Sequence, residues 1–131
     1  MIQSGICSSF KEVDRTLERI KESFTDMQCE RLNTKVTFIL FTFRELLNNG
    51  VEHGNLQDDR KRVVYQIGCT GKVFQIDVWD EGSGFDLPKQ LMDDSIDRVL
   101  NMSSMGIFLI RKMGFHVSAN AGHVMAVLEL D

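Results

Sequence analysis

The chain has 131 residues, a formal net charge of −4 at pH 7 and a hydrophobic fraction of 43%. This length is enough for one core and too short for two ordinary domains, so we predict a single domain over residues 1–131. The acidic balance, without a Lys/Arg cluster along one helix face, argues against nucleic acid as a partner.

The first predicted helix runs from Phe10 to Phe24. Its apolar residues recur at steps of three and four, which places them on one stripe, and Ser8 or Ser9 precedes them as the cap. No strand is predicted before this helix, and its apolar stripe should be buried.

A second helix is predicted to open after Asn33 or Thr34 and to end at Gly50 or Gly54. Its first half is almost entirely apolar, so most of its sides should be buried. Polar residues nevertheless gather toward its C-terminal end, namely Glu45, Asn48, Asn49 and His53. Buried polar side chains need partners, so this end of the helix is a candidate for a site.

Two strand-like runs follow, residues 62–69 and 72–80, joined by Thr70-Gly71. This dipeptide is typical of a tight hairpin, so the two strands should pair antiparallel. Side chains alternate between the two faces of a strand, and this places Asp80 on the same face as the apolar residues of its run. A carboxylate is therefore predicted on the core side of the sheet.

The segment from Phe85 to Ser103 holds the only proline and is predicted as a loop, with room for a short helix within Leu91–Leu100. Helical spacing resumes from Met105 to Met113, and Gly114 supplies its stop.

Two closing strands, residues 115–120 and 123–130, flank an Ala121-Gly122 turn. The order helix-helix-strand-strand-helix-strand-strand predicts an α+β fold. We expect a two-layer sandwich in which a mixed, mostly antiparallel sheet packs on helices.

A cytoplasmic location is expected from three features of the sequence. The longest apolar stretch is far short of the ~20 residues that span a bilayer, and the N-terminus lacks the basic start of a secretory signal. The three cysteines are odd in number and widely spaced, which favours reduced thiols over disulfides or a zinc site.

The first candidate site pairs a carboxylate with a carboxamide. Glu45 and Asn49 are four residues apart on a predicted helix and so share a face, and His53 would join them if the helix persisted. These two groups could orient a hydroxyl and hold Mg²⁺ through oxygen. Such pairs are more often solvated surface residues, so the spacing alone leaves that alternative open.

The second candidate is the loop from Asp80 to Phe85, where Gly82 and Gly84 follow an inward carboxylate. Glycines allow a ligand to approach the backbone closely, and the carboxylate could accept a hydrogen bond from an exocyclic amine. The alternative is a strand-ending turn capped by its own aspartate.

The third candidate is Ser104-Met105-Gly106, which is predicted to precede a helix directly. Free N–H groups and the helix dipole favour a phosphate there, although an ordinary helix start has the same pattern.

These three segments, in this order, resemble a known ATP-binding fold, the one shared by DNA gyrase, heat-shock chaperones, mismatch-repair proteins and histidine kinases. The motifs are Glu45 to Asn49 with His53-Gly54, Asp80-x-Gly82-x-Gly84-Phe85, and Met105 to Ile110. They most resemble the small anti-sigma factor serine/threonine kinases. The likeness covers nearly the whole chain and implies a histidine-kinase-like ATPase fold with ATP and Mg²⁺ as cofactors.

The resemblance also implies roles for single residues. The residue matching Glu45 acts as general base toward a substrate serine, the one matching Asn49 ligates Mg²⁺, and Asp80 would bind the adenine amine. Gly82 and Gly84 would shape the floor of the pocket.

The phosphates would lie under a lid formed by residues 85–103, and the resemblance assigns their contacts to the backbone of Ser104, Met105, Gly106 and Ile107. The implied protein substrate is an antagonist of the anti-anti-sigma type, with a sulfate-transporter/anti-sigma fold. The implied kinase is a homodimer that also sequesters a sigma factor.

The sequence departs from the family pattern at three places. Ser104 replaces a glycine, which predicts weaker phosphate contact. Gly114-Phe115-His116 stands where a Met-Asp pair is usual, and His123 follows Gly122 where the family has a threonine facing the adenine.

Two other functions remain open on the sequence. One is a nucleotide-poor binding module that sequesters a regulator without catalysis. The other is an isolated histidine-kinase-type catalytic domain, since the first histidine is His53 and no phosphoacceptor histidine lies on an earlier helix.

Overall fold

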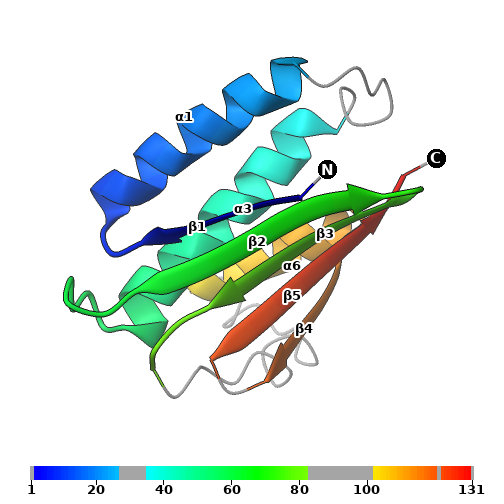
Figure 1. Ribbon diagram of the computed structural model, residues 1–131. Coiled ribbons are helices and arrows are strands. Elements are labelled where there is room, and N and C mark those ends of the chain that lie inside the picture. The colour runs from blue at the N-terminus through cyan, green and yellow to red at the C-terminus, as the bar shows by residue number, and fades with distance from the viewer. Residues whose placement is uncertain (1, 27–34, 83–101, 121, 131) are drawn as a thin grey trace.

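The fold is described by a computed structural model, which covers residues 2–26, 35–82, 102–120 and 122–130 (Figure 1). The strands are β1 (Ile2–Cys7), β2 (Val63–Thr70), β3 (Val73–Trp79), β4 (His116–Asn120) and β5 (His123–Glu129). The helices are α1 (Phe10–Asp26), α3 (Val36–Asn49), the short π-helix η1 (Gly50–Gly54) and α6 (Met102–Lys112).

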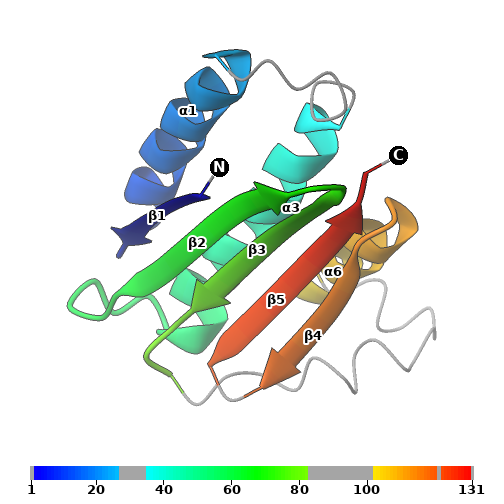
Figure 2. The same ribbon diagram turned by 45° about the vertical axis from the view of Figure 1, so that its right-hand side comes forward.

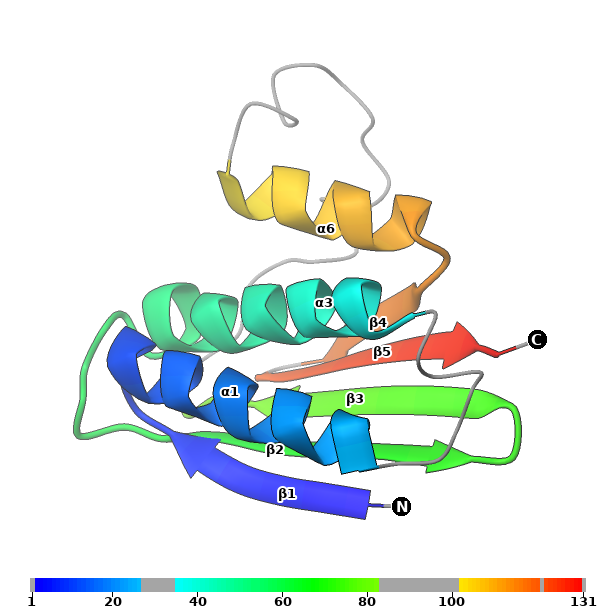
Figure 3. The same ribbon diagram turned by 90° about the horizontal axis from the view of Figure 1, so that it is seen from above.

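The five strands form one sheet, and α1, α3 and α6 pack on one of its faces (Figures 1 and 3). α3 lies between α1 and α6 in this helical layer (Figure 3). The other face of the sheet carries no helix from the described part of the chain (Figure 2). The predicted two-layer α+β sandwich is therefore confirmed.

The strand order is β1-β2-β3-β5-β4, and the described neighbours all pair antiparallel. The predicted mixed sheet is corrected in this respect, since the described strands include no parallel pair. Connections of two residues join β2 to β3 and β4 to β5, and hairpin turns of this length connect only antiparallel neighbours. Gly71 in the first of these turns has φ +60, a left-handed conformation that costs glycine little.

β1 is the main element that the sequence analysis misses. It pairs antiparallel with β2, with Cys7 opposite Val63. Ile2 and Ile6 are 68% and 52% exposed, whereas Cys7 is fully buried. The two isoleucines therefore point away from the helices, which inverts the pattern expected for a half-buried strand.

The end of α3 also differs from an ordinary helix stop. Gly50 keeps helical torsions, with φ −62 and ψ −45, and the chain continues directly into η1. The N–H of Asn55 donates to the carbonyl of Gly50 at 2.8 Å, the wide i→i+5 bond of a π-turn. Such turns are frequent at functional sites.

The core fills the space between sheet and helices. The apolar stripe of α1 that periodicity predicts is buried there from Val13 to Phe24 and meets the inward-facing alternate residues of the central strands, whereas Phe10 at the start of the helix is 40% exposed. Phe43 of α3 packs edge-on against Tyr65 of β2, with ring centroids 5.0 Å apart. No helix in the described residues is long and apolar enough to cross a membrane.

Candidate functional site

Asp80 follows β3 directly and is fixed by backbone on two sides. Its N–H donates to the carbonyl of Gly122 at 2.8 Å, and its Oδ1 accepts the N–H of Gly82 at 2.8 Å. Its side chain lies on the helical side of the sheet, against Gly54 at the end of η1: a Cβ atom at position 54 would lie 2.7 Å from Oδ1 of Asp80. The carboxylate therefore lies where β3, β5 and η1 meet.

Three glycines make this close approach possible. A Cβ atom at Gly82 would lie 2.6 Å from the carbonyl carbon of Gly54, closer than real Cβ atoms come to other atoms. Gly122 has φ +79, and a Cβ there would lie 3.1 Å from the carbonyl oxygen of Asp80. Side chains at these positions would displace the backbone that surrounds the carboxylate.

Burial raises the pKa of Asp80 above its ordinary value, and the hydrogen bond from the Gly82 N–H acts in the opposite direction. Within the described residues, that bond is the only one its carboxylate accepts. A partly desolvated carboxylate with spare acceptor capacity is suited to bind the amine of a ligand.

Glu45 lies on the side of α3 that faces α6. A Cβ atom at Gly106 would overlap its Oε2 and lie 3.0 Å from its Cδ. Burial raises the pKa of Glu45; Arg44 lowers it and Glu52 raises it, both to a smaller extent. A half-buried carboxyl group with a raised pKa has the character of a general base.

Asn49, one turn further along α3, is only 4% exposed. Its Nδ2 is buried and has no hydrogen-bond partner among the described residues. Buried polar atoms are nearly always paired, so this carboxamide is a place where a bound group would supply the missing partner. Its nitrogen and oxygen exchange places by a half-turn of the side chain, so the partner could be an acceptor or a cation.

His53 does not join this pair. Its side chain is 40% exposed, and its Nε2 lies 3.8 Å from Oε2 of Glu52. The widening of the helix at η1 replaces the regular four-residue spacing on which the shared face depended.

The prediction for the Ser104-Met105-Gly106 segment needs a correction. The chain is already helical at Met102, so Ser104-Met105-Gly106 does not precede α6 but forms part of it. The N–H groups of Gly106 and Ile107 therefore lie within the hydrogen-bond ladder of the helix, and Ile107 is a core residue with 1% exposure. The free N–H groups of a helix belong to its first turn, which moves this candidate toward Met102.

Part of the predicted site lies outside the described residues. This holds for Gly84, for Phe85 and for the predicted lid up to residue 101, including the short helix within 91–100, whereas residues 102 and 103 of that lid belong to α6. The side chains of Ser104 and Met105 are likewise not described.

His123, which stands where the resemblance predicts a threonine facing the adenine, lies away from Asp80. Its Nε2 is 2.8 Å from Oδ1 of Asp77, and its ring stacks on Trp79 with centroids 4.7 Å apart. Strand alternation puts all three side chains on the sheet face opposite the helices. The substitution at position 123 therefore does not place an imidazole beside the Asp80 carboxylate.

Sequence reasoning misses Asn55, the residue after η1. It is 1% exposed, its Oδ1 accepts the N–H of Glu81 at 2.8 Å, and its Nδ2 donates to the carbonyl of Arg62 at 3.0 Å. The only sequence signal for it is an asparagine after the predicted helix end, which is common in ordinary turns.

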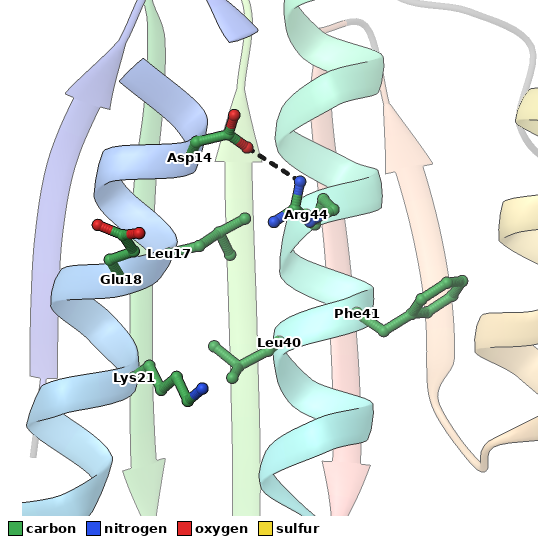
Figure 4. A pocket seen from close by; sticks show the side chains of 7 residues that line it. All are labelled: Asp14, Leu17, Glu18, Lys21, Leu40, Phe41 and Arg44. Atoms are coloured by element: carbon green, nitrogen blue, oxygen red, sulfur yellow. Dashed lines mark hydrogen bonds and ion pairs between the residues drawn. The ribbon is translucent and has the colours of Figure 1, made fainter. Parts of the chain in front are cut away.

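A groove of about 520 Å³ lies elsewhere, between α1 and α3 (Figure 4). Leu17 and Leu40 point toward each other across it, and Arg44 bridges to Asp14 at 2.9 Å (Figure 4). Both charged side chains are at least half exposed, so this ion pair contributes little to stability. None of the predicted site residues lines the groove.

The comparison with protein families agrees with the geometry. The sequence model of the histidine kinase-like ATPase domain matches residues 10–129, which is nearly the whole chain. No curated protein matches the sequence significantly.

Proposed function

Because the chain belongs to the histidine kinase-like ATPase domain family, we propose that it is an ATP-dependent protein-serine kinase of the partner-switching type. Membership of this family indicates that the chain is an ATP-binding, kinase-like domain. The finer proposal is that it phosphorylates a serine on an antagonist protein of the anti-anti-sigma type. Its support is the resemblance of the Glu45, Asp80 and Gly106 motifs to anti-sigma factor kinases.

One observation carries the nucleotide part of the proposal: the Asp80 carboxylate lies on the helical side of the sheet in contact with Gly54, and only Gly82 supplies it with a hydrogen bond among the described residues. We propose that it accepts a hydrogen bond from the exocyclic amine of adenine. Guanine has a carbonyl oxygen where adenine has its exocyclic amine. That oxygen is an acceptor and would face the Asp80 carboxylate, so ATP should bind more tightly than GTP.

Glu45 is the proposed general base. Its half-buried position on α3 raises its pKa, which brings it closer to the pH at which it must accept a proton from a serine hydroxyl. Its contact with Gly106 holds the carboxylate at the surface between α3 and α6.

Asn49 is the proposed Mg²⁺ ligand. Mg²⁺ prefers oxygen ligands and is usually held by few protein groups together with substrate phosphates and water. The described residues contain no group of three His, Cys, Asp or Glu side chains that could hold a metal, whereas the buried Nδ2 atom of Asn49 has no hydrogen-bond partner among them. A half-turn of this side chain would bring its oxygen, the ligand type that Mg²⁺ prefers, to the place of the unpaired nitrogen. These residues fit an ion that arrives with its nucleotide and neutralises phosphate charge during transfer.

Nucleotide binding is tested by calorimetry with ATP and Mg²⁺. We expect micromolar affinity, with Asp80→Asn weakening it by about tenfold to a hundredfold because a hydrogen bond to a charged group is lost. Asp14→Asn is the control, because Asp14 is an exposed carboxylate in the distant groove. Absence of heat at millimolar ATP would exclude the kinase and favour a binding module that works without nucleotide.

Catalysis is tested with ATP labelled in the γ-phosphate and an antagonist protein encoded near this chain. Glu45→Gln should lower turnover by about a hundredfold or more while leaving ATP affinity nearly unchanged, since a general base acts in the transition state. Acid-stable label on the antagonist indicates phosphoserine. Acid-labile label would instead indicate phosphohistidine and an isolated histidine-kinase-type domain.

The partner assignments complete the proposal. We propose a homodimer that also binds a sigma factor or another regulator, as in the family that the chain resembles. Sedimentation of the purified protein, alone and with each candidate partner, measures both the dimer and the exchange of partners. A monomer that binds neither partner would restrict the proposal to its nucleotide part.

A further inference from the structure

Asn55 lies at the junction of the two halves of the proposed nucleotide site. It follows η1, which extends the helix of Glu45 and Asn49, and it contacts the loop that carries Asp80. It is 1% exposed, and neither the general base, nor the metal ligand, nor the adenine contact accounts for a buried carboxamide here.

The two ends of the Asn55 side chain make bonds of opposite polarity. Oδ1 accepts the N–H of Glu81 at 2.8 Å, and Nδ2 donates to the carbonyl of Arg62 at 3.0 Å. Exchanging the two ends would place an amine against an N–H and an oxygen against a carbonyl, so the orientation is unambiguous. Each end of the carboxamide is therefore paired with the backbone of a different loop.

The Glu81 side chain closes this arrangement into a ring. Its carboxylate accepts the N–H of Arg62, so Asn55, Arg62 and Glu81 each bond to the next. Asp80 is adjacent to this ring, and its own N–H is held by Gly122. The peptide groups on both sides of the Asp80 Cα are thus fixed, one by Gly122, which directly precedes β5, and the other by Asn55.

We infer that Asn55 is a positioning residue that, through the Glu81 N–H, holds the Asp80 carboxylate in the orientation that binds adenine. This inference rests on the proposed function, since it assigns Asn55 a role at the same site. Without the bond from Asn55, the peptide between Asp80 and Glu81 can rotate, and the carboxylate loses the orientation in which it meets the amine of the base.

Two variants test the role. Asn55→Ala removes both bonds, and Glu81→Ala opens the ring at an exposed side chain that leaves no buried gap. ATP affinity is measured for each, alone and combined with Asp80→Asn. If Asn55 acts through Asp80, each variant weakens ATP binding when Asp80 is present, by about tenfold for Asn55→Ala. In the Asp80→Asn background, each variant should have little further effect on ATP affinity.

A control separates positioning from general stability. Thr42→Ala truncates a fully buried polar side chain of α3 whose Oγ1 has no hydrogen-bond partner among the described residues. It changes the packing of a buried position of α3 and should leave ATP affinity unchanged at temperatures where the protein is folded. The positioning role would be wrong if Asn55→Ala left ATP affinity unchanged, as Thr42→Ala should. It would also be wrong if Asn55→Ala lowered ATP affinity by the same factor in the wild-type protein and in the Asp80→Asn background.

A readout without nucleotide keeps this inference distinct from the proposed function. The carboxyl pKa of Asp80, followed by nuclear magnetic resonance, should fall toward its ordinary value in Asn55→Ala because a loosened loop admits water. It should not change in Thr42→Ala. Failure of the wild-type protein to bind ATP would overturn the proposed function, whereas an unchanged Asp80 titration in both Asn55→Ala and Glu81→Ala would overturn the positioning role. If Asn55→Ala does not fold, Glu81→Ala decides.

Discussion

Glu45 of α3 and Gly106 of α6 are in direct contact: a Cβ atom at position 106 would overlap Oε2 of Glu45 and lie 3.0 Å from its Cδ. The glycine is buried in the middle of a helix, where it is less favourable than alanine by roughly 0.5–1 kcal/mol. Its presence there leaves room for the carboxylate of the proposed base.

Gly106→Ala should therefore preserve the fold and impair catalysis. The overlapping atom is the end of a flexible side chain, so Glu45 moves while the helices stay packed, and alanine favours the helix. A displaced base is expected to lower turnover by about tenfold to a hundredfold. Leu109→Ala, at an exposed position of the same helix, is the control for turnover assays. Full turnover in Gly106→Ala would show that the contact does not position the base.

Gly54→Ala should weaken nucleotide binding. The added methyl group would occupy the place of the Asp80 carboxylate, lying 2.7 Å from its Oδ1, so the carboxylate must turn away. We expect a loss of ATP affinity similar to that of Asp80→Asn, measured by calorimetry. Gly71→Ala is a matched control, because that glycine has φ +60 and open space around it. It should cost about 1 kcal/mol of stability through backbone strain and leave ATP affinity unchanged.

Hydrophobic periodicity in the sequence is sufficient to predict a helix or strand, and its buried face, wherever that element buries one continuous stripe. The apolar residues of α1 at steps of three and four are core residues from Val13 to Phe24, with only Phe10 at the helix start exposed, and the alternation in β3 places Asp80 on the helical side. Both patterns are local consequences of burying one face of a helix or strand.

β1 shows where this signal fails. Its most apolar residues, Ile2 and Ile6, lie on the open face of the sheet, and its inward positions include Gly5 and Cys7. What holds the strand is its backbone pairing with β2, which a sequence pattern does not report. The same holds for Asn55, whose partner Glu81 is 26 positions away and is brought to it by the meeting of η1 and β3.

The pH dependence of stability should reveal the Asp80 carboxylate. Burial raises its pKa above the ordinary 3.8, so the folded protein keeps a proton at pH values where the unfolded chain has released it. The stability contributed by this proton is present below the ordinary pKa and is lost as the pH rises through the higher folded value. Asp80→Asn cannot release a proton and should flatten this fall in the free energy of unfolding.

Urea denaturation of the wild-type protein and of Asp80→Asn, from about pH 3.5 to pH 6, measures this change in the free energy of unfolding. Asp58→Asn is the control of opposite sign. A side-chain hydrogen bond from Arg60 is the main cause of the lowered pKa of Asp58, so the stability due to this group is present at higher pH and lost on acidification. Because Asp58 is only partly covered at the surface and its partner Arg60 is 87% exposed, the effect of this ion pair should be small. Parallel curves for wild type and Asp80→Asn would contradict the assignment.

Gly5→Ala should destabilise the fold through the edge of the sheet. A Cβ atom at this position would lie 2.7 Å from Cζ of Tyr65, which is fully buried, packs edge-on against Phe43 and accepts a hydrogen bond from Arg19. The ring cannot retreat without disturbing the core, and overpacking of this kind costs about 1–3 kcal/mol in the free energy of unfolding. Ser4→Ala is the matched control, because Ser4 is exposed on the other face of β1. Equal urea midpoints for the two variants would mean that β1 does not pack against Tyr65, and a lower midpoint for Gly5→Ala alone would confirm the strand that the sequence pattern conceals.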